Sequence, residues 1–135
     1  MSGAPILFED FQPGAVMGEC VEAYDLAQAR RWQAIFGSDP ENGADGPVEG
    51  VCMAVVNMMR AYLNVVVPRP PGNVHAKQQL NMYGIPVQGE SMRATVVCVG
   101  KEMRRERRYV ELQVSGTGNG GRKLFDGLVT LIWAA

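Results

Sequence analysis

GADGPVEGVCMAVVNMMRAYLNVVV, at residues 43–67, is the stretch that decides the fold. Residues 51–66 within it predict a long helix in which hardly any side chain is polar. The exceptions are Asn57, Arg60 and Asn64, which at 3.6 residues per turn fall on one narrow stripe. The remaining apolar surface must be covered by lipid or by protein. The polar stripe argues against a membrane span, which requires ~20 predominantly apolar residues, so we expect a helix buried in the centre of a soluble fold.

Length and composition set the broad class of protein. The chain has 135 residues and a formal net charge of −1, which is typical of one globular domain spanning residues 1–135. A near-neutral charge gives no general attraction to nucleic acid or to an anionic membrane, so we expect neither as a partner. Cys20, Cys52 and Cys98 lack the spacing of a metal site and fit free thiols in a reducing compartment. The cysteine spacing therefore gives no reason to expect a metal. Because the N-terminal residues lack the pattern of a signal peptide, we expect a cytoplasmic protein.

The segment before the buried helix predicts an arm, a strand and an amphipathic helix. Residues 8–14, FEDFQPG, combine aromatic residues with a Pro-Gly turn signal, and residues 15–24 are typical of a strand. Asp25 is placed to cap the next helix, with Gln28 three residues later completing a capping-box pattern. Gly37 is placed to end that helix. We expect it to cover the fold with its apolar side.

The buried helix has recognisable start and stop signals. Residues 38–50 form a loop rich in Asp, Glu, Asn, Gly and Pro. At its end, Gly46 is placed as the N-cap, Pro47 as the first helical residue and Glu49 as the third. The helix must end before Pro68, because the sequence PRPPG that starts there cannot continue it.

After Gly72 the hydrophobic period changes from 3.6 to 2, which predicts strands. The predicted strands span residues 74–82, 91–102, 109–116 and 124–133, with turns at 83–90, 103–107 and 116–121. Strands that follow helices as one run, rather than alternating with them, indicate an α+β fold. A curled antiparallel sheet wrapped around the long helix would supply the apolar walls that the helix needs.

Four segments, in this order and at this spacing, resemble the MaoC-like hydratase/dehydratase family of the hot-dog fold. They are FEDFQPG at residues 8–14, AIFGSDP at 34–40, GADGPVEGVCMAVV at 43–56 and NMYGIPVQGE at 81–90. The resemblance covers nearly the whole chain. It implies a hot-dog domain, in which the residue 51–66 helix is the central helix enclosed by the sheet.

The resemblance also implies that the protein binds an acyl thioester, carried by coenzyme A or by acyl carrier protein, with no separate cofactor. The acyl group would lie in a tunnel at a homodimer interface, and the thioester carbonyl near the N-terminus of the central helix. Free backbone N–H groups and the positive end of the helix dipole can polarise such a carbonyl. Gly50, followed by Val51, is the expected binding segment, since a residue without a side chain lets a ligand approach closely.

The catalytic residues depart from the family's pattern. The segment GSDPENGADGPVEG contains no histidine, although the family's segment provides an Asp and a His for water and proton transfer. Asp39 stands in the place of the family's Asp, or in the place of its Asn with Ser38 in that of the Asp, and Glu49 replaces a later His. Both are candidate catalytic residues, whereas a turn residue and a helix-capping residue are the alternatives for Asp39 and Glu49 respectively.

Three functions follow from this departure. The chain is a divergent enoyl-CoA hydratase or 3-hydroxyacyl dehydratase, an acyl-CoA thioesterase that uses Glu49, or a non-catalytic subunit in a hetero-oligomer with another hot-dog chain. The only histidine, His75, lies on a strand among polar residues and predicts a surface position. Residues 101–108, KEMRRERR, either pair with coenzyme A phosphates or form a solvated hairpin.

Overall fold

The computed structural model describes residues 4–36 and 47–135, and the predicted elements are present there. The described residues form two helices and five strands, in this order: β1 (Val16–Ala23), α1 (Leu26–Phe36), α2 (Pro47–Val65), β2 (Val74–Met82), β3 (Ser91–Arg104), β4 (Arg107–Thr117) and β5 (Lys123–Trp133). Short 3-10 turns lie at Phe8–Asp10 and Asn119–Gly121. Within the described residues, no helix is long and apolar enough to cross a membrane.

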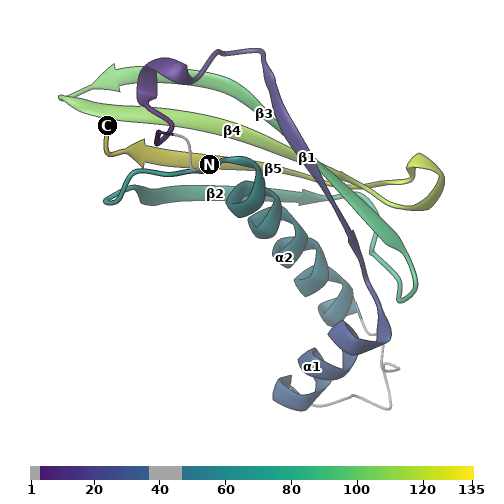
Figure 1. The fold of residues 1–135 in the computed structure, drawn as a ribbon. Coiled ribbons are helices and arrows are strands. Elements are labelled where there is room, and N and C mark those ends of the chain that lie inside the picture. Colours follow the sequence, from purple (N-terminus) through teal and green to yellow (C-terminus); the bar gives the residue numbers. More distant parts are fainter. Residues whose placement is uncertain (1–3, 37–46) are drawn as a thin grey trace.

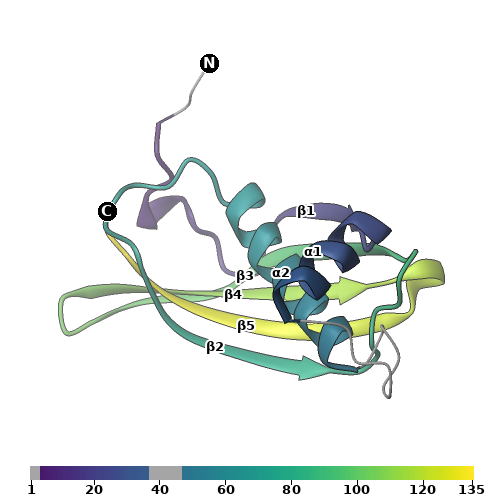
Figure 2. The ribbon, with the colours of Figure 1, turned by 90° about the horizontal axis from the view of Figure 1, so that it is seen from below.

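The five strands form one antiparallel sheet in the order β1-β3-β4-β5-β2. The sheet curls over α2, and α1 projects beyond the N-terminal end of α2 (Figure 1). Seen from below, α2 runs along one face of the sheet, between β1 on one side and β2 on the other (Figure 2). The predicted α+β architecture, a curled antiparallel sheet around one long helix, is therefore confirmed.

The core lies between α2 and the concave face of the sheet. Alternate side chains of β3, β4 and β5 point towards α2, as the period-2 pattern requires. The fully or almost fully buried residues of this interface are Met53, Ala54, Met58, Ala61, Tyr62 and Val66 of the helical segment, with Ala94, Val96, Cys98, Val110, Leu112, Val114, Val129 and Leu131 of the sheet. Each large apolar side chain buried here contributes about 1.5–3 kcal/mol, so this interface is the main source of stability.

The polar stripe of α2 faces β1. Asn57 donates to Oε1 of Glu22 at 3.2 Å, and Arg60 donates to Oε2 of the same carboxylate at 2.7 Å. One turn further on, Asn64 donates to the Cys20 sulfur at 3.8 Å. The stripe predicted from the sequence therefore joins α2 to the edge strand β1, instead of leaving the helix bare to solvent.

The predicted helix signals are largely confirmed. The Gln28 N–H donates to the Asp25 carboxylate at 2.9 Å, as expected of an N-cap. The side-chain oxygen of Gln28 accepts no hydrogen bond from the described residues, Asp25 included, so the reciprocal half of the capping box is not formed. Helix α2 starts at Pro47 and ends before Pro68, as predicted. The predicted caps Gly37 and Gly46 lie outside the described residues.

β2 is an edge strand and is less regular than its sequence pattern predicts. The period-2 pattern places Val74, Ala76, Leu80 and Met82 on the apolar face of a half-buried strand. Val74 and Ala76 are nevertheless exposed, and Leu80 and Met82 are only partly buried. The register against β5 shifts between His75 and Lys77, which breaks the alternation of faces. The β3–β4 connection is tighter than predicted, because Arg105 and Glu106, with φ of 53° and 66°, form a two-residue turn.

Candidate functional site

A buried carboxyl group marks the N-terminal end of α2. Glu49, in the first turn of the helix, is only 1% exposed. Tyr24, which directly follows β1, donates its hydroxyl to Oε2 of this carboxyl group. Gln33 of α1 donates its side-chain amide to Oε1 at 3.0 Å. Three elements distant in sequence therefore meet at one carboxyl group.

Among the described residues, the groups that donate to Glu49 are polar but neutral. Its hydrogen-bond partners in the described part of the chain are a hydroxyl and an amide, and no ion pair to it is formed there. Burial raises the pKa of Glu49 because the charged form loses its hydration. A carboxyl group with a raised pKa can give up or accept a proton closer to neutral pH, which is the property of a general acid or base.

The two residues after Glu49 take different positions. Gly50 is buried, and a Cβ atom there would overlap the Ile85 side chain and lie 2.9 Å from the Pro86 carbonyl oxygen. The close approach that requires glycine is therefore made by the chain's own β2–β3 loop. Val51 is partly buried. The binding role of Gly50 and Val51 stays a prediction.

The first turn of α2 has backbone donors that the helix itself does not use. An N–H group in an α-helix donates to the carbonyl four residues earlier, so the N–H groups of Val48 and Glu49 have no acceptor within α2. The helix dipole adds partial positive charge at the same end. This end of α2 can thus stabilise negative charge on an oxygen atom placed beside it.

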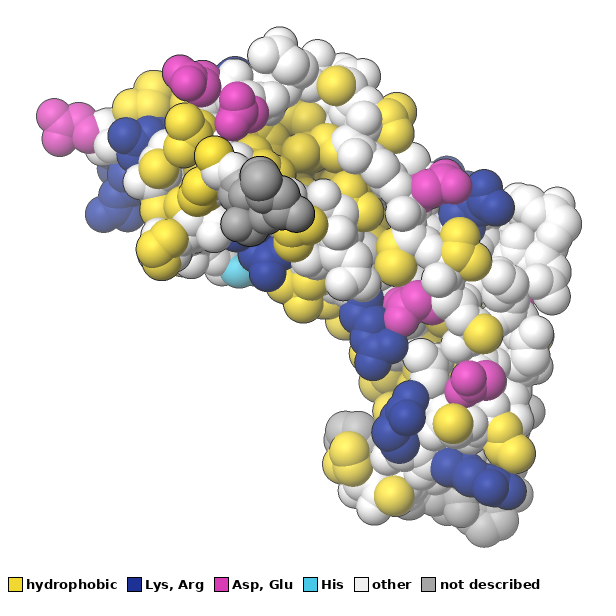
Figure 3. All heavy atoms as spheres, viewed as in Figure 1, with side chains coloured by type: hydrophobic (Ala, Val, Ile, Leu, Met, Phe, Trp, Pro, Cys, Tyr) yellow, Lys and Arg dark blue, Asp and Glu magenta, His cyan; other side chains and the backbone are white. Residues whose placement is uncertain are grey.

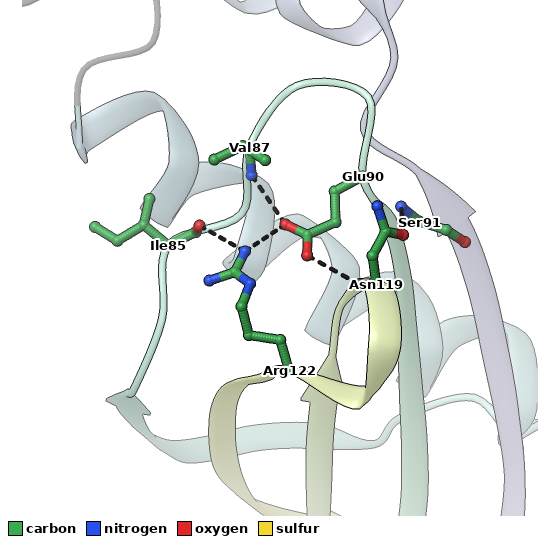
Figure 4. A network of polar contacts seen from close by, with 6 residues as sticks. All are labelled: Ile85, Val87, Glu90, Ser91, Asn119 and Arg122. Carbon is green, nitrogen blue, oxygen red and sulfur yellow. Dashed lines mark hydrogen bonds and ion pairs between the residues drawn. The ribbon is translucent and has the colours of Figure 1, made fainter.

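The loop beside Gly50 is anchored by a second buried carboxylate, Glu90 (Figure 4). Glu90, 2% exposed, accepts from the Val87 N–H at 3.1 Å, from the Asn119 N–H at 2.9 Å and from Arg122 at 2.5 Å. Arg122 also donates to the Ile85 carbonyl oxygen at 3.1 Å. Burial alone would raise the pKa of Glu90, but these donors together lower it below the usual range.

The other predicted site residues do not join Glu49 in the described structure. Asp39 lies outside the described residues. His75 is exposed on β2 and contacts the ring of Tyr62, with ring centroids 6.4 Å apart. Tyr62 follows Glu49 by 13 helical residues, which corresponds to roughly 20 Å along α2. The histidine therefore lies towards the opposite end of the helix.

The basic segment at residues 101–108 forms the β3–β4 hairpin, at the end of the sheet that lies away from the N-terminal end of α2 (Figure 1). Lys101 donates to the Phe8 carbonyl oxygen at 3.0 Å. The Arg104 guanidinium lies 4.3 Å from the centre of the Tyr109 ring, and Arg108 donates to the Ala134 carbonyl oxygen at 3.3 Å. These contacts favour the interpretation of this segment as a solvated hairpin.

Two groups of residues at this site were missed by sequence reasoning. Tyr24 and Gln33 carry no local signal, because only the tertiary fold brings them to Glu49. The pair Glu90 and Arg122 had a weak signal, since each is a charged residue beside a glycine-rich turn. That signal gave no reason to pair them.

Solved structures share this fold. A MaoC-like dehydratase from Rhodospirillum rubrum has a TM-score of 0.75 at 14% identity, over 96% of this chain and 98% of that chain. For the R-hydratase PhaJ1 from Pseudomonas aeruginosa the TM-score is 0.73 at 12% identity, over 93% and 84%. For the ChsH1–ChsH2 complex from Mycobacterium tuberculosis it is 0.64 at 12% identity, over 91% and 98%. No protein-family model and no curated protein sequence matches the chain.

These similarities define the class of fold. The chain has the hot-dog fold of the MaoC-like dehydratases and (R)-hydratases. The resemblance found in the sequence is thus confirmed at the level of the fold.

Proposed function

We propose that this protein binds an acyl thioester with the thioester carbonyl at the N-terminal end of α2. The observation that carries the proposal is the enclosed polar cluster that Tyr24 and Gln33 form with Glu49, which lies in the first turn of this helix. Buried polar groups are expensive unless they are paired, and this cluster lies where the helix offers backbone donors. Proteins with the same fold include hydratases and dehydratases, and acyl thioesters are the substrates that the sequence resemblance implies.

In the proposed binding mode, the N-terminal end of α2 polarises the thioester carbonyl. The N–H groups of Val48 and Glu49 have no acceptor within α2, and a thioester carbonyl oxygen would accept from one of them. Such donors stabilise the enolate that forms when a proton is removed from the carbon beside the carbonyl, or when water adds to the β-carbon of an enoyl thioester. Coenzyme A or acyl carrier protein would carry the acyl group.

The acid–base groups of this chain argue against a hydratase that works on its own. Addition of water to a double bond requires one group that activates the water and one that transfers a proton to carbon. Glu49 is available for one of these steps, whereas His75 lies beside Tyr62, which is roughly 20 Å further along α2. We therefore propose that the chain is the binding subunit of a hot-dog assembly, in which a second chain supplies the missing histidine.

The surface of the chain supports a partner of this kind. β2 is an edge strand whose first six residues are all exposed, so its unpaired backbone groups are available to another strand. Three hydrophobic side chains on α2 or just after it are exposed: Val56 by 37%, Leu63 by 43% and, beyond the end of the helix, Val67 by 47%. Hydrophobic side chains also border the hollow beneath the sheet (Figure 3). A second hot-dog chain, identical or related, would cover such surfaces, and ChsH1–ChsH2 is a complex.

One observation favours a second candidate function, a stand-alone enzyme that uses Glu49. Burial raises the pKa of Glu49, and catalytic carboxyl groups are often tuned in this direction. In this case Glu49 would be the acid or base of a divergent enoyl-CoA hydratase or dehydratase, with Asp39 as the second group. Alternatively, Glu49 would activate water for hydrolysis of the thioester itself.

One experiment separates the two candidates. The purified protein is incubated with crotonyl-CoA and longer enoyl-CoA substrates, and both loss of the double bond and release of free thiol are measured. Binding of butyryl-CoA is measured by titration calorimetry. The proposal predicts binding without turnover, and turnover when a second hot-dog chain with an intact Asp/His pair is added.

Two results would decide otherwise. Turnover by the protein alone, lost in Glu49→Gln or Asp39→Asn and retained in His75→Ala, would establish the stand-alone enzyme. Failure to bind butyryl-CoA or acylated carrier protein under any of these conditions would refute the proposed thioester site.

A further inference from the structure

We infer that the Glu90–Arg122 ion pair positions the Glu49 site, by holding the β2–β3 loop against the first turn of α2 and the end of β1. Neither residue belongs to the polar cluster around Glu49. Both act through the backbone and side chains of residues 84–90. The functional consequence rests on the proposed thioester site, but the structural coupling can be tested separately.

The ion pair closes the loop on itself. Arg122 donates to Oε1 of Glu90 at 2.5 Å and to the carbonyl oxygen of Ile85 at 3.1 Å. It thereby joins two points of the loop that are five residues apart, and ties both to the turn between β4 and β5. A Cβ atom on Gly118 would overlap the Glu90 carboxylate, so this turn lies directly against it. Since Glu90 is 2% exposed, the loop is anchored from inside the protein.

The first link from this anchor to the site runs through Gly50. The Ile85 side chain and the Pro86 carbonyl oxygen occupy the space where a side chain at position 50 would lie. Gly50 directly follows Glu49 in the first turn of α2. A shift of residues 85 and 86 would therefore leave a gap beside the backbone that is proposed to bind the thioester carbonyl.

The second link runs through Tyr24. The Tyr24 N–H donates to the Glu90 carbonyl oxygen at 2.9 Å, and the Gly89 N–H donates to the Tyr24 carbonyl oxygen at 2.6 Å. These two bonds fix the backbone of the residue whose hydroxyl donates to Glu49. Loss of the anchor would thus displace both a hydrogen-bond donor of Glu49 and the loop packed on Gly50.

The test compares Arg122→Gln with a matched control, Arg93→Gln. Arg93 also forms an ion pair with a glutamate, Glu19, at 3.1 Å, but both partners are largely exposed on β1 and β3. Butyryl-CoA affinity is measured by calorimetry, and the chemical shifts of the Glu49 carboxyl carbon and the Gly50 amide by NMR. We expect Arg122→Gln to weaken binding by roughly 10-fold to 100-fold, as displaced supporting groups do elsewhere, and to move both NMR signals. Arg93→Gln should leave all three unchanged.

A second variant keeps the test decisive if Arg122→Gln does not fold. Arg122→Lys retains a positive charge for Glu90, but both bonds are donated by Nη2 of Arg122, and the shorter lysine side chain has no nitrogen at that position. We expect intermediate affinity and smaller movements of the same NMR signals. Unchanged Glu49 and Gly50 signals in a folded Arg122 variant would overturn the inference.

Failure of the proposed function has a different signature. If the wild-type protein does not bind butyryl-CoA, the thioester site is wrong, whereas the NMR signals still report whether Arg122 positions Glu49. If the wild-type protein binds and the Arg122 variants bind equally well, the positioning role is wrong and the thioester site stands.

Discussion

Replacing Tyr24 by phenylalanine tests the site at its most buried hydrogen bond. The ring of Tyr24 is 1% exposed, and phenylalanine fills the same volume, so the change removes only the hydroxyl. The Glu49 oxygen that accepts from it would be left without its donor, while the other oxygen keeps the bond from Gln33 at 3.0 Å. The net loss is about 0.5–1.5 kcal/mol for a neutral acceptor and about 1.5–3 kcal/mol for a charged one.

The cost of Tyr24→Phe should therefore depend on pH. The pKa of Glu49 is raised in the folded protein. The stability that Glu49 contributes in its protonated form is therefore fully present below the ordinary glutamate pKa of about 4.3. That contribution is lost as the pH rises through the raised folded pKa. Removing a donor that favours the carboxylate raises the folded pKa further. The variant should thus lose stability more steeply than the wild type, by about 1 kcal/mol more at pH 8 than at pH 4.

Urea unfolding across this pH range measures the difference, with the unfolding slope checked for constancy. The matched control is Tyr62→Phe, because Tyr62 is 6% exposed and lies on α2, away from Glu49. Its own pKa is raised above the ordinary tyrosine value, so it does not titrate in this range. Equal, pH-independent losses in the two variants would refute the assignment of Tyr24 as the partner of a titrating Glu49.

Three further predictions concern the core, the loop anchor and the histidine. Gly127→Ala places a Cβ atom where the Met58 sulfur lies, so it should destabilise the fold by about 1–3 kcal/mol. Met58→Ala should cost less stability in the Gly127→Ala variant than in the wild type. If urea unfolding shows that the two costs simply add, the contact between residues 58 and 127 is contradicted. Glu90 has a lowered pKa, so its contribution is present above the ordinary value and lost as the pH falls through the folded pKa. Glu90→Gln should therefore cost about 1–3 kcal/mol at pH 7, and less as the pH falls below the ordinary glutamate pKa. A cost that does not change with pH would contradict this role of the Glu90 carboxylate. His75→Ala, on an exposed side chain, should change stability by less than about 0.5 kcal/mol and leave acyl-CoA binding unaltered, and a large loss of binding would place His75 in the site.

Much of the fold could be predicted because its signals are local. Pro47 and Pro68 bracket α2 through backbone geometry alone, and the period-2 pattern locates the strands after Gly72. The alternation failed on β2, where an edge strand with a register shift exposes Val74. A hydrophobic pattern predicts which residues can be buried, but not whether a neighbouring strand is there to bury them.

The site was harder to predict because its contacts are long-range. Glu49 was found through its position in the first turn of a helix, a local feature. Its partners Tyr24 and Gln33 lie 25 and 16 residues away, and no spacing rule joins them. The partner of the polar stripe was hidden for the same reason, since Glu22 meets Asn57 only once β1 has joined the sheet.

The strand order has a consequence for folding kinetics. β3, β4 and β5 pair with sequence neighbours through short turns, whereas β1 pairs with β3 and β2 with β5 across long stretches of chain. Closing long loops costs more entropy before any contact is gained, so we expect the β3–β4–β5 meander to form first and the edge strands later. Pulse-labelled hydrogen exchange should protect β4 amides before β1 amides. Tyr24 follows β1, so the cluster around Glu49 would be among the last parts of the molecule to assemble.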